Sequence, residues 1–145
     1  MEFKEFGKED LDNASELFVS IFNGAPWNDK WTFKTARKSL KDFIDTPKFI
    51  GITCYKQKEL VGFLVGNREQ WCEGEVFYLK EMGIKNNFQG KGIGTELIKS
   101  LREKLKGTKV NGIYLLTEKR SNAEKFYLKN GFNINEEMIL MDGGV

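Results

Sequence analysis

The sequence predicts a mixed α/β domain that spans residues 1–145 and is built on one central, mostly antiparallel sheet flanked by helices. Three observations support this fold class. Apolar residues recur at helical spacing in several segments, short β-rich runs lie between these segments, and no repeat, linker or low-complexity tract divides the chain. A length of 145 residues also suits one ordinary domain with a sizeable core. The expected order of elements is β-α-α-β-β-β-α-β-α-β.

The first third of the chain predicts one strand and two helices. A short strand near 2–6 precedes a helix near 9–22, whose apolar residues fall on one face. The segment "NGAPWNDKW", residues 23–31, interrupts the helical pattern, because Asn-Gly and the following proline are turn chemistry. A second helix is expected near 32–45 and ends before Pro47.

The middle of the chain predicts three consecutive strands. "FIGITCYK" (49–56) and "LVGFLVGN" (60–67) are β-rich runs separated by a short polar turn, which is typical of a hairpin. "GEVFYLKEMGI" (74–84) predicts a third, longer strand.

The last third alternates helix and strand. Residues 92–107 predict an amphipathic helix closed by a glycine, and 110–117 predict a strand. A short helix is expected within 121–132, followed by a final strand over 132–141.

Composition and charge exclude several classes of function. The formal net charge is +2 and the lysines are interleaved with acidic residues, which argues against nucleic acid as a partner. The apolar runs are too short to span a bilayer, so no membrane partner is expected. No apolar signal-peptide core follows Met1, and the cytoplasm is therefore the expected compartment.

The absence of histidine restricts the chemistry further. It excludes a Ser-His-Asp or Cys-His catalytic system. Cys54 and Cys72 belong to no CxxC motif, so a zinc site would need unusual ligands and no metal is expected. Acid–base chemistry must use carboxylates, tyrosine, lysine, cysteine or water.

The motif "NNFQGKGIGTEL", residues 86–97, suits a strand-to-helix loop whose backbone approaches a phosphate group. A Walker A loop needs GxxxxGK followed by Ser or Thr, and a Rossmann loop needs GxGxxG; neither spacing is present. The free N–H groups and positive end of the following helix favour a pyrophosphate. A tight turn without a ligand is the alternative.

Two motifs together resemble the GNAT superfamily of N-acetyltransferases. "QGKGIG" (89–94) matches the family signature Q/R-x-x-G-x-G/A, and "AEKFYLKNGF" (123–132) is similar to a later helix of the family. The resemblance implies acetyl-CoA as donor, an amine as acceptor, and direct transfer without an acyl-enzyme. It also allows a homodimer, because relatives commonly dimerise through sheet edges or terminal strands.

The resemblance further implies that acetyl-CoA is held mainly by main-chain groups. The end of the strand at 74–84 would bind pantetheine, and the loop at 89–95 would bind the pyrophosphate. Many members carry an asparagine at the position of Arg120, and Asn122 lies two residues later. The expected cofactor-binding residues are Met82, Gly83, Ile84, Gln89, Gly90, Lys91, Gly92, Ile93, Gly94, Thr95 and Asn122.

Two residues are catalytic candidates by resemblance. Tyr127 stands at the family position that protonates the departing thiolate, and its alternative role is packing against the sheet. Glu81 stands where some relatives carry an acidic residue facing the acceptor; it would act through water, attract a cationic amine, or simply be a solvated carboxylate. Period-2 alternation places Glu75 on the same face if no bulge intervenes, so Glu75 is the reserve candidate.

The segment "APWNDKWTF" (25–33) lies in the region that shapes acceptor specificity in the family. Trp27 and Trp31, with Asn28 and Asp29, would form an aromatic and acidic wall for an amine. The alternative is that the two tryptophans anchor an irregular connection.

The acceptor stays open among several classes. The leading expectation is a primary amine of a small molecule (a polyamine, an aminoglycoside or an amino-acid-like compound), bound by Trp27, Trp31 and Glu81. The alternatives are acetylation of a protein or peptide amine, or a CoA-binding module without activity.

Overall fold

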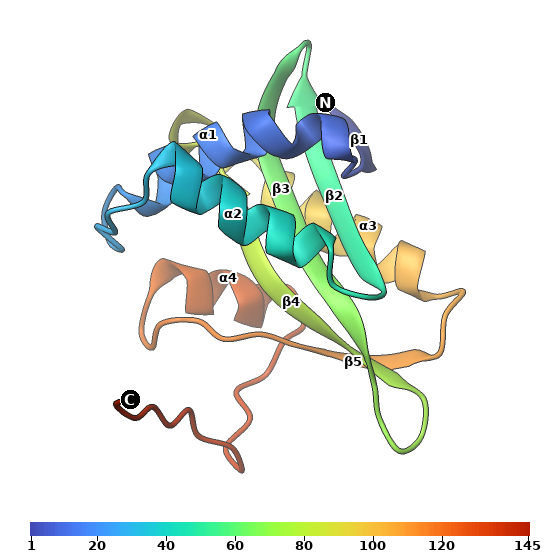
Figure 1. Cartoon of the computed structure of the whole chain (residues 1–145). Helices are drawn as coiled ribbons and strands as arrows, with labels where there is room; N and C mark the ends of the chain where they lie inside the picture. The colour runs from blue at the N-terminus through green and yellow to red at the C-terminus, as the bar shows by residue number, and fades with distance from the viewer. The chain divides into compact units, whose positions relative to one another are not determined.

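A five-stranded sheet organises the first part of the chain, in the spatial order β1-β2-β3-β4-β5 (Figure 1). The strands are β1 (Glu2–Glu5), β2 (Phe49–Lys56), β3 (Glu59–Gln70), β4 (Glu75–Ile84) and β5 (Val110–Tyr114). The first three strand pairs are antiparallel, and β4 and β5 are parallel. The predicted mixed, mostly antiparallel sheet is therefore confirmed.

Three helices cover this sheet, α1 (Leu11–Phe22) and α2 (Phe33–Ile44) on one face and α3 (Ile93–Leu105) on the other (Figure 1). Two glycines of the sheet show which helix packs on which face. A Cβ on Gly83 would lie 2.8 Å from Ile21 of α1, whereas a Cβ on Gly62 would lie 3.3 Å from Ile93 of α3. None of the helices combines the length and apolar character needed to cross a bilayer.

The computed structural model describes all residues, 1–145, and divides them into two compact units, Met1–Leu115 and Leu116–Val145. The sheet and the helices α1 to α3 belong to the first unit. The second unit contains α4 (Asn122–Lys129).

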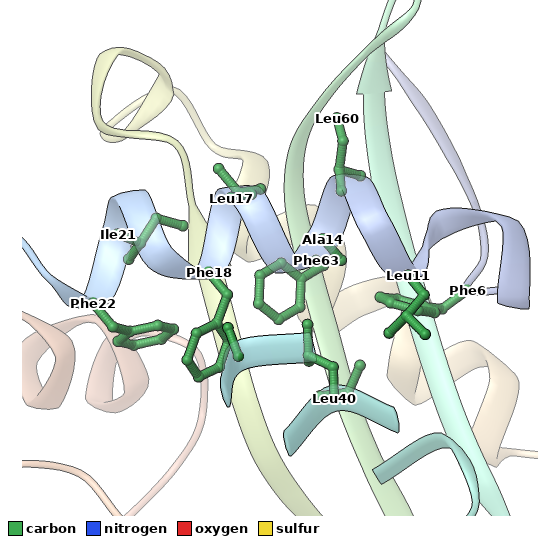
Figure 2. Close-up of a cluster of buried hydrophobic side chains, with 12 residues drawn as sticks. Phe6, Leu11, Ala14, Leu17, Phe18, Ile21, Phe22, Leu40, Leu60 and Phe63 are labelled. Atoms are coloured by element: carbon green, nitrogen blue, oxygen red, sulfur yellow. The ribbon is translucent and has the colours of Figure 1, made fainter. Parts of the chain in front are cut away.

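A cluster of buried side chains joins α1 and α2 to the sheet (Figure 2). The rings of Phe18 and Phe63 stack with centroids 6.4 Å apart, and Phe6 meets Phe63 edge-on at 6.5 Å. Full burial of such a side chain stabilises a fold by roughly 1.5–3 kcal/mol. The members of the cluster are Phe6, Leu11, Ala14, Leu17, Phe18, Ile21, Phe22, Ala36, Leu40, Leu60, Phe63 and Val65. This packing fixes α1, and the loop that follows it, against β3.

A β-bulge interrupts β4 and corrects one prediction. Val65 of β3 pairs with Glu81, but the next residue, Gly66, pairs with Leu79, so Lys80 is the extra residue. Each bulge reverses the alternation of side chains beyond it. Glu81 therefore shares the α1/α2 face with Val65, and Glu75 lies on the α3 face. A shared face for the two glutamates required a strand without a bulge, and because the bulge is present they lie on opposite faces.

The helix α4 lies within the predicted range 121–132. The hydroxyl of its N-cap residue Ser121 accepts a hydrogen bond from the amide of Glu124 at 3.1 Å. The chain leaves the helix through Gly131, whose φ is +87°, a left-handed conformation that glycine adopts without strain.

The final strand predicted over 132–141 is absent from the structure, and β5 ends at Tyr114 rather than at 117. A strand exists only through its ladder with a neighbour, and residues 132–141 pair with no strand. The pattern itself is also imperfect, because four consecutive apolar residues, 138–141, replace strict alternation. Ile139 is 80% exposed as a result.

Candidate active site

The edge of β4 that faces β5 forms a strand ladder only along the first residues of β4. The parallel ladder joins β4 and β5 from Glu75 to Tyr78, and β5 ends at Tyr114. From Leu79 to Ile84 no strand pairs with this edge. The predicted pantetheine-binding residues Met82, Gly83 and Ile84 lie in this stretch. Their main-chain groups on that side are available to an extended ligand.

The loop after β4 is folded by its own side chains. Phe88, at 8% exposure, anchors the 3-10 turn Asn86–Phe88. The side-chain amide of Gln89 donates to the carbonyl of Ile84 at 3.1 Å and to Oδ1 of Asn86 at 3.3 Å. Gln89 therefore ties the loop back to the end of β4.

Two glycines of this loop adopt left-handed backbone conformations. The φ angles are +73° at Gly90 and +84° at Gly92, and a Cβ at either position would meet no atom within 4 Å. The glycines are needed for the backbone turn and not because of crowding. Open space in front of them allows a ligand to approach the main chain.

The helix α3 begins directly after Gly92, which is its N-cap and provides no side-chain cap. The first-turn amides, which include those of Ile93, Gly94 and Thr95, thus have no capping side chain as acceptor. Together with the positive end of the helix dipole and the exposed ammonium of Lys91, they form a site suited to an anion. The side chain of Ile93 is buried, so only its main chain is available.

Glu81 has an unusual ionisation for a carboxylate. Burial, and then the negative charge of Asp29, raise its pKa to about 7. No cation forms an ion pair with Glu81. A carboxyl group that titrates near neutral pH suits the transfer of a proton to or from a reacting amine.

The connection between α1 and α2 is held by an asparagine clamp. Asn23 donates from Nδ2 to the carbonyl of Trp31 and accepts at Oδ1 from the amide of Trp31, both at 2.8 Å. The ring of Trp31 packs edge-on against Phe18 at 4.9 Å. Trp31 is thus an anchor of the connection.

Asp29 and Trp27 are presented by the same connection. The indole of Trp31 donates to Oδ2 of Asp29 at 3.1 Å, and the amide of Asp29 donates to the carbonyl of Phe22 at 2.9 Å. Trp27 packs against Phe22 at 5.2 Å and is 40% exposed. The clamp therefore fixes the carboxylate of Asp29, whose charge acts on Glu81, and leaves the ring of Trp27 open.

The remaining predicted site residues, Asn122 and Tyr127, belong to α4 in the second unit. The Tyr127 ring lies edge-on to Phe126 at 5.2 Å and to Phe132 at 5.4 Å, and its carbonyl accepts from the amide of Phe132 at 3.0 Å. These contacts orient the tyrosine within its own unit.

A family model described as the acetyltransferase (GNAT) family matches residues 11–132. The chain belongs to the acetyltransferase (GNAT) family. It is therefore a GNAT-type N-acetyltransferase, and the resemblance seen in the two motifs is confirmed. No curated protein sequence matches the chain.

Solved structures share the fold at low identity. An aminoglycoside N-acetyltransferase, AAC(6')-Iy, in complex with CoA is 14% identical, with a TM-score of 0.78, over 98% of this chain and 93% of that one. An aminoglycoside acetyltransferase from an uncultured soil metagenomic sample is 16% identical, with a TM-score of 0.78, over 99% and 95% of the two chains. A transcriptional regulator from Bacillus halodurans C-125 is 18% identical, with a TM-score of 0.79, over 98% and 99%. These likenesses support the fold class.

Sequence reasoning left one feature of this site open and missed another. It allowed for a bulge in the strand at 74–84, and the structure places that bulge at Lys80, where it turns Glu81 toward α1 and α2. The clamp by Asn23 was missed, because Asn-Gly at 23–24 indicates a turn and not a side-chain bridge to Trp31.

Proposed function

We propose that this GNAT chain transfers an acetyl group from acetyl-CoA directly to a primary amine of a small molecule, within a ternary complex. The observation that carries the proposal is the unpaired edge of β4, which runs into the left-handed glycine loop at the start of α3. This edge and loop offer main-chain groups to a long ligand that ends in a pyrophosphate.

The donor would be bound mostly by the backbone. The edge formed by Met82, Gly83 and Ile84 would pair with the amides of pantetheine, as an added strand does. The pyrophosphate would lie in the loop from Gln89 to Thr95, against the amides of the first helical turn. Asn122, on α4, is retained as a further cofactor contact on the strength of the resemblance. Acetyl-CoA supplies the activated acetyl group.

The acceptor would be a cationic amine. Asp29 and Glu81 provide negative charge and Trp27 provides open aromatic surface, which together attract an ammonium group; Trp31 supports this wall by holding Asp29 in place. Glu81, directly or through a water molecule, would take a proton from the ammonium so that the nitrogen can attack. A group with a pKa of about 7 is unprotonated in a large fraction of molecules at neutral pH.

Tyr127 would complete the reaction as the acid. When the carbon–sulfur bond of the thioester breaks, the phenol gives its proton to the departing thiolate. This role rests on the match of "AEKFYLKNGF" to the family motif. Replacement of Tyr127 by Phe should lower kcat by about 10²-fold and leave the Kd for CoA nearly unchanged. An equal loss in both quantities would instead assign Tyr127 to binding.

Polycationic amines are the first acceptors to test, because two structures with this fold are aminoglycoside acetyltransferases. Release of free thiol from acetyl-CoA would be followed with polyamines, aminoglycosides, amino acids and a lysine-containing peptide. Turnover with a small amine supports the proposal. Turnover with the peptide alone would favour a protein amine as acceptor.

Binding of the donor is tested separately by thermal unfolding with acetyl-CoA. A ligand that binds only the native state raises Tm with its concentration. Protection without turnover on any amine would indicate a CoA-binding module without activity. No protection at millimolar acetyl-CoA would contradict the proposal.

A further inference from the structure

We propose a second ligand site, specific for a phosphate-type oxyanion, in the cavity lined by Lys48, Arg68, Glu75 and Lys109. The ligand is a free phosphate ion or the phosphomonoester of a small metabolite. The cavity has a volume of about 470 Å³ and belongs entirely to the first unit. It lies at the end of α3 opposite the glycine loop, about 20 Å away along a helix of 13 residues.

A buried carboxylate organises the cations of this cavity. The side chain of Glu75 is 5% exposed; Lys48 donates to its Oε2 at 2.6 Å, and Nε of Arg68 lies 3.5 Å from its Oε1. The cations come from three separate segments, the connection before β2, the strand β3 and the residue before β5. A single glutamate therefore holds two of them in fixed positions.

The cations carry more donors than Glu75 can use. The terminal nitrogens of the Arg68 guanidinium and the ammonium of Lys109 form no hydrogen bond with a protein group. Lys48 has further N–H donors beyond the one given to Glu75. Planar guanidinium and ammonium donors around one concave site match the oxygens of a phosphate group.

The charge of the cavity is positive even after its own carboxylate is counted. Three cations face one anion, and the C-terminal end of α3 adds only about half a negative charge. The nearest other hydroxyl, on Thr108, is already committed to the carbonyl of Leu105 at 2.6 Å and to the amide of Val110 at 3.2 Å. Recognition thus depends on the cations.

The backbone conformation of Lys48 is held by neighbouring contacts, which fixes the position of this cation. Its φ is +63°, a left-handed conformation that costs a lysine free energy and persists only where neighbouring contacts enforce it. Two contacts do so here. Its carbonyl accepts from the amide of Arg68 at 3.1 Å, and its ammonium is bound to Glu75.

The test is calorimetric titration of the full chain with inorganic phosphate, at ionic strength matched with chloride and with CoA saturating. Saturation separates this site from the glycine loop, where phosphate would compete with CoA. Wild-type protein should bind phosphate, and Lys109→Gln should weaken the binding by roughly tenfold. Lys109 has no ion pair to lose, so this variant should fold normally.

Two control variants complete the experiment. Lys99→Gln removes the same charge from an exposed position of α3 and should bind phosphate like wild type. Lys91→Gln lies in the glycine loop and should also bind phosphate normally. Loss of phosphate binding on saturation with CoA, or equal affinity in Lys109→Gln and wild type, would overturn the proposal.

A second titration with glycerol 3-phosphate identifies the source of the oxyanion. Tighter binding than inorganic phosphate assigns the site to a phosphomonoester, and equal or weaker binding assigns it to the free ion. Failure of acetyl transfer would not affect these results, because no step of the titration depends on turnover.

Discussion

The two ends of β4 each carry a glutamate, and the pKa values of the two are shifted in opposite directions. Glu75, at the beginning of the strand, has a pKa held below its ordinary value by the hydrogen bond from Lys48, with the charges of Arg68 and Lys109 adding to the effect and burial opposing it. Glu81, at the other end, has its pKa raised to about 7 by burial and by the charge of Asp29.

The difference shows that burial alone does not set the ionisation of a carboxylate. Both side chains are withdrawn from water, but only Glu75 meets cations that favour its charged form. One bulge separates them, and it directs the two side chains to opposite faces. One end of β4 consequently carries an ion-paired carboxylate, and the other carries a carboxyl group with a pKa near neutral pH.

Loss of the Glu81 carboxylate should change catalysis more strongly than any other substitution. Glu81→Gln should lower kcat/KM by about 10²–10³-fold, because an amide cannot accept the proton of the acceptor amine. In the wild type the rate should rise with pH through about 7 and then level off, since the base acts in its unprotonated form. Thiol release measured across pH tests both statements. Glu73→Gln, at an exposed position, is the matched control, and a pH limb that survives in Glu81→Gln would exclude Glu81 as the base.

Replacement of glutamate by glutamine should raise Tm at position 81 and lower it at position 75. The pKa of Glu81 is about 7 in the folded protein and 4.5 in the unfolded chain. Ionised Glu81 therefore lowers the free energy of unfolding of the wild type by up to about 3 kcal/mol above pH 7. This penalty grows as pH rises from 4.5 to 7. Glu81→Gln should therefore raise Tm at pH 8 and change it little at pH 5.

Glu75 has a lowered pKa, so its contribution is present above its ordinary pKa of 4.5 and is lost as pH falls below it. Glu75→Gln should lower Tm at pH 8 by several degrees, because Lys48 and Arg68 lose their partner. Thermal unfolding at both pH values measures the two variants. Tm shifts of the same sign at pH 8 would contradict the comparison.

Two left-handed glycines, Gly74 before β4 and Gly92 after it, differ in the space around them. Gly74→Ala should destabilise the fold by more than about 1 kcal/mol, because φ is +74° and the new Cβ would lie 2.8 Å from the carbonyl of Lys109. Gly92→Ala should cost only the backbone strain, about 1 kcal/mol, because its Cβ meets nothing.

The order of the two variants should be reversed for the KM of acetyl-CoA. Gly92→Ala should raise the KM for acetyl-CoA several-fold, since its methyl group would enter the space proposed for the pyrophosphate, whereas Gly74→Ala should leave that KM unchanged. Denaturant unfolding and steady-state kinetics separate the effects. Gly112→Ala, with open space and an ordinary φ, controls for the loss of a glycine.

Removal of the charge of Asp29, which acts on Glu81, should change activity only slightly. Asp29→Asn removes a negative charge that raises the pKa of Glu81, so the rising limb of the pH–rate profile should move to lower pH. The KM for a cationic acceptor should rise at the same time. Asn28→Gly, one residue away and compatible with the left-handed φ of +52° at this position, should leave the pH limb in place. An unchanged limb in Asp29→Asn would assign the shift of Glu81 to burial alone.

Local patterns predicted most elements well. The predicted runs at 49–56 and 74–84 became β2 and β4 almost residue for residue, and the helix at 92–107 became α3. Such elements follow from short-range periodicity and turn residues. The strand predicted at 132–141 failed, because pairing depends on a partner that the segment itself does not contain.

The candidate site was predictable where it is made of backbone. The glycine loop could be found because glycine is the residue that tolerates the left-handed conformation at Gly90 and Gly92. The catalytic roles of Tyr127 and Glu81 and the acceptor roles of Trp27 and Trp31 stay proposals, because each depends on where a ligand lies relative to the side chain.

The family, the fold class and the loop that suits a pyrophosphate follow from sequence patterns alone, because each pattern is made of residues close together in the chain. The pKa values of the two glutamates of β4 could not be read from such patterns. Their ionisation depends on Lys48, Arg68 and Asp29, which are distant in sequence, and on a bulge that reverses the side-chain alternation. Electric fields act through space, so they follow from the folded arrangement and not from the order of residues.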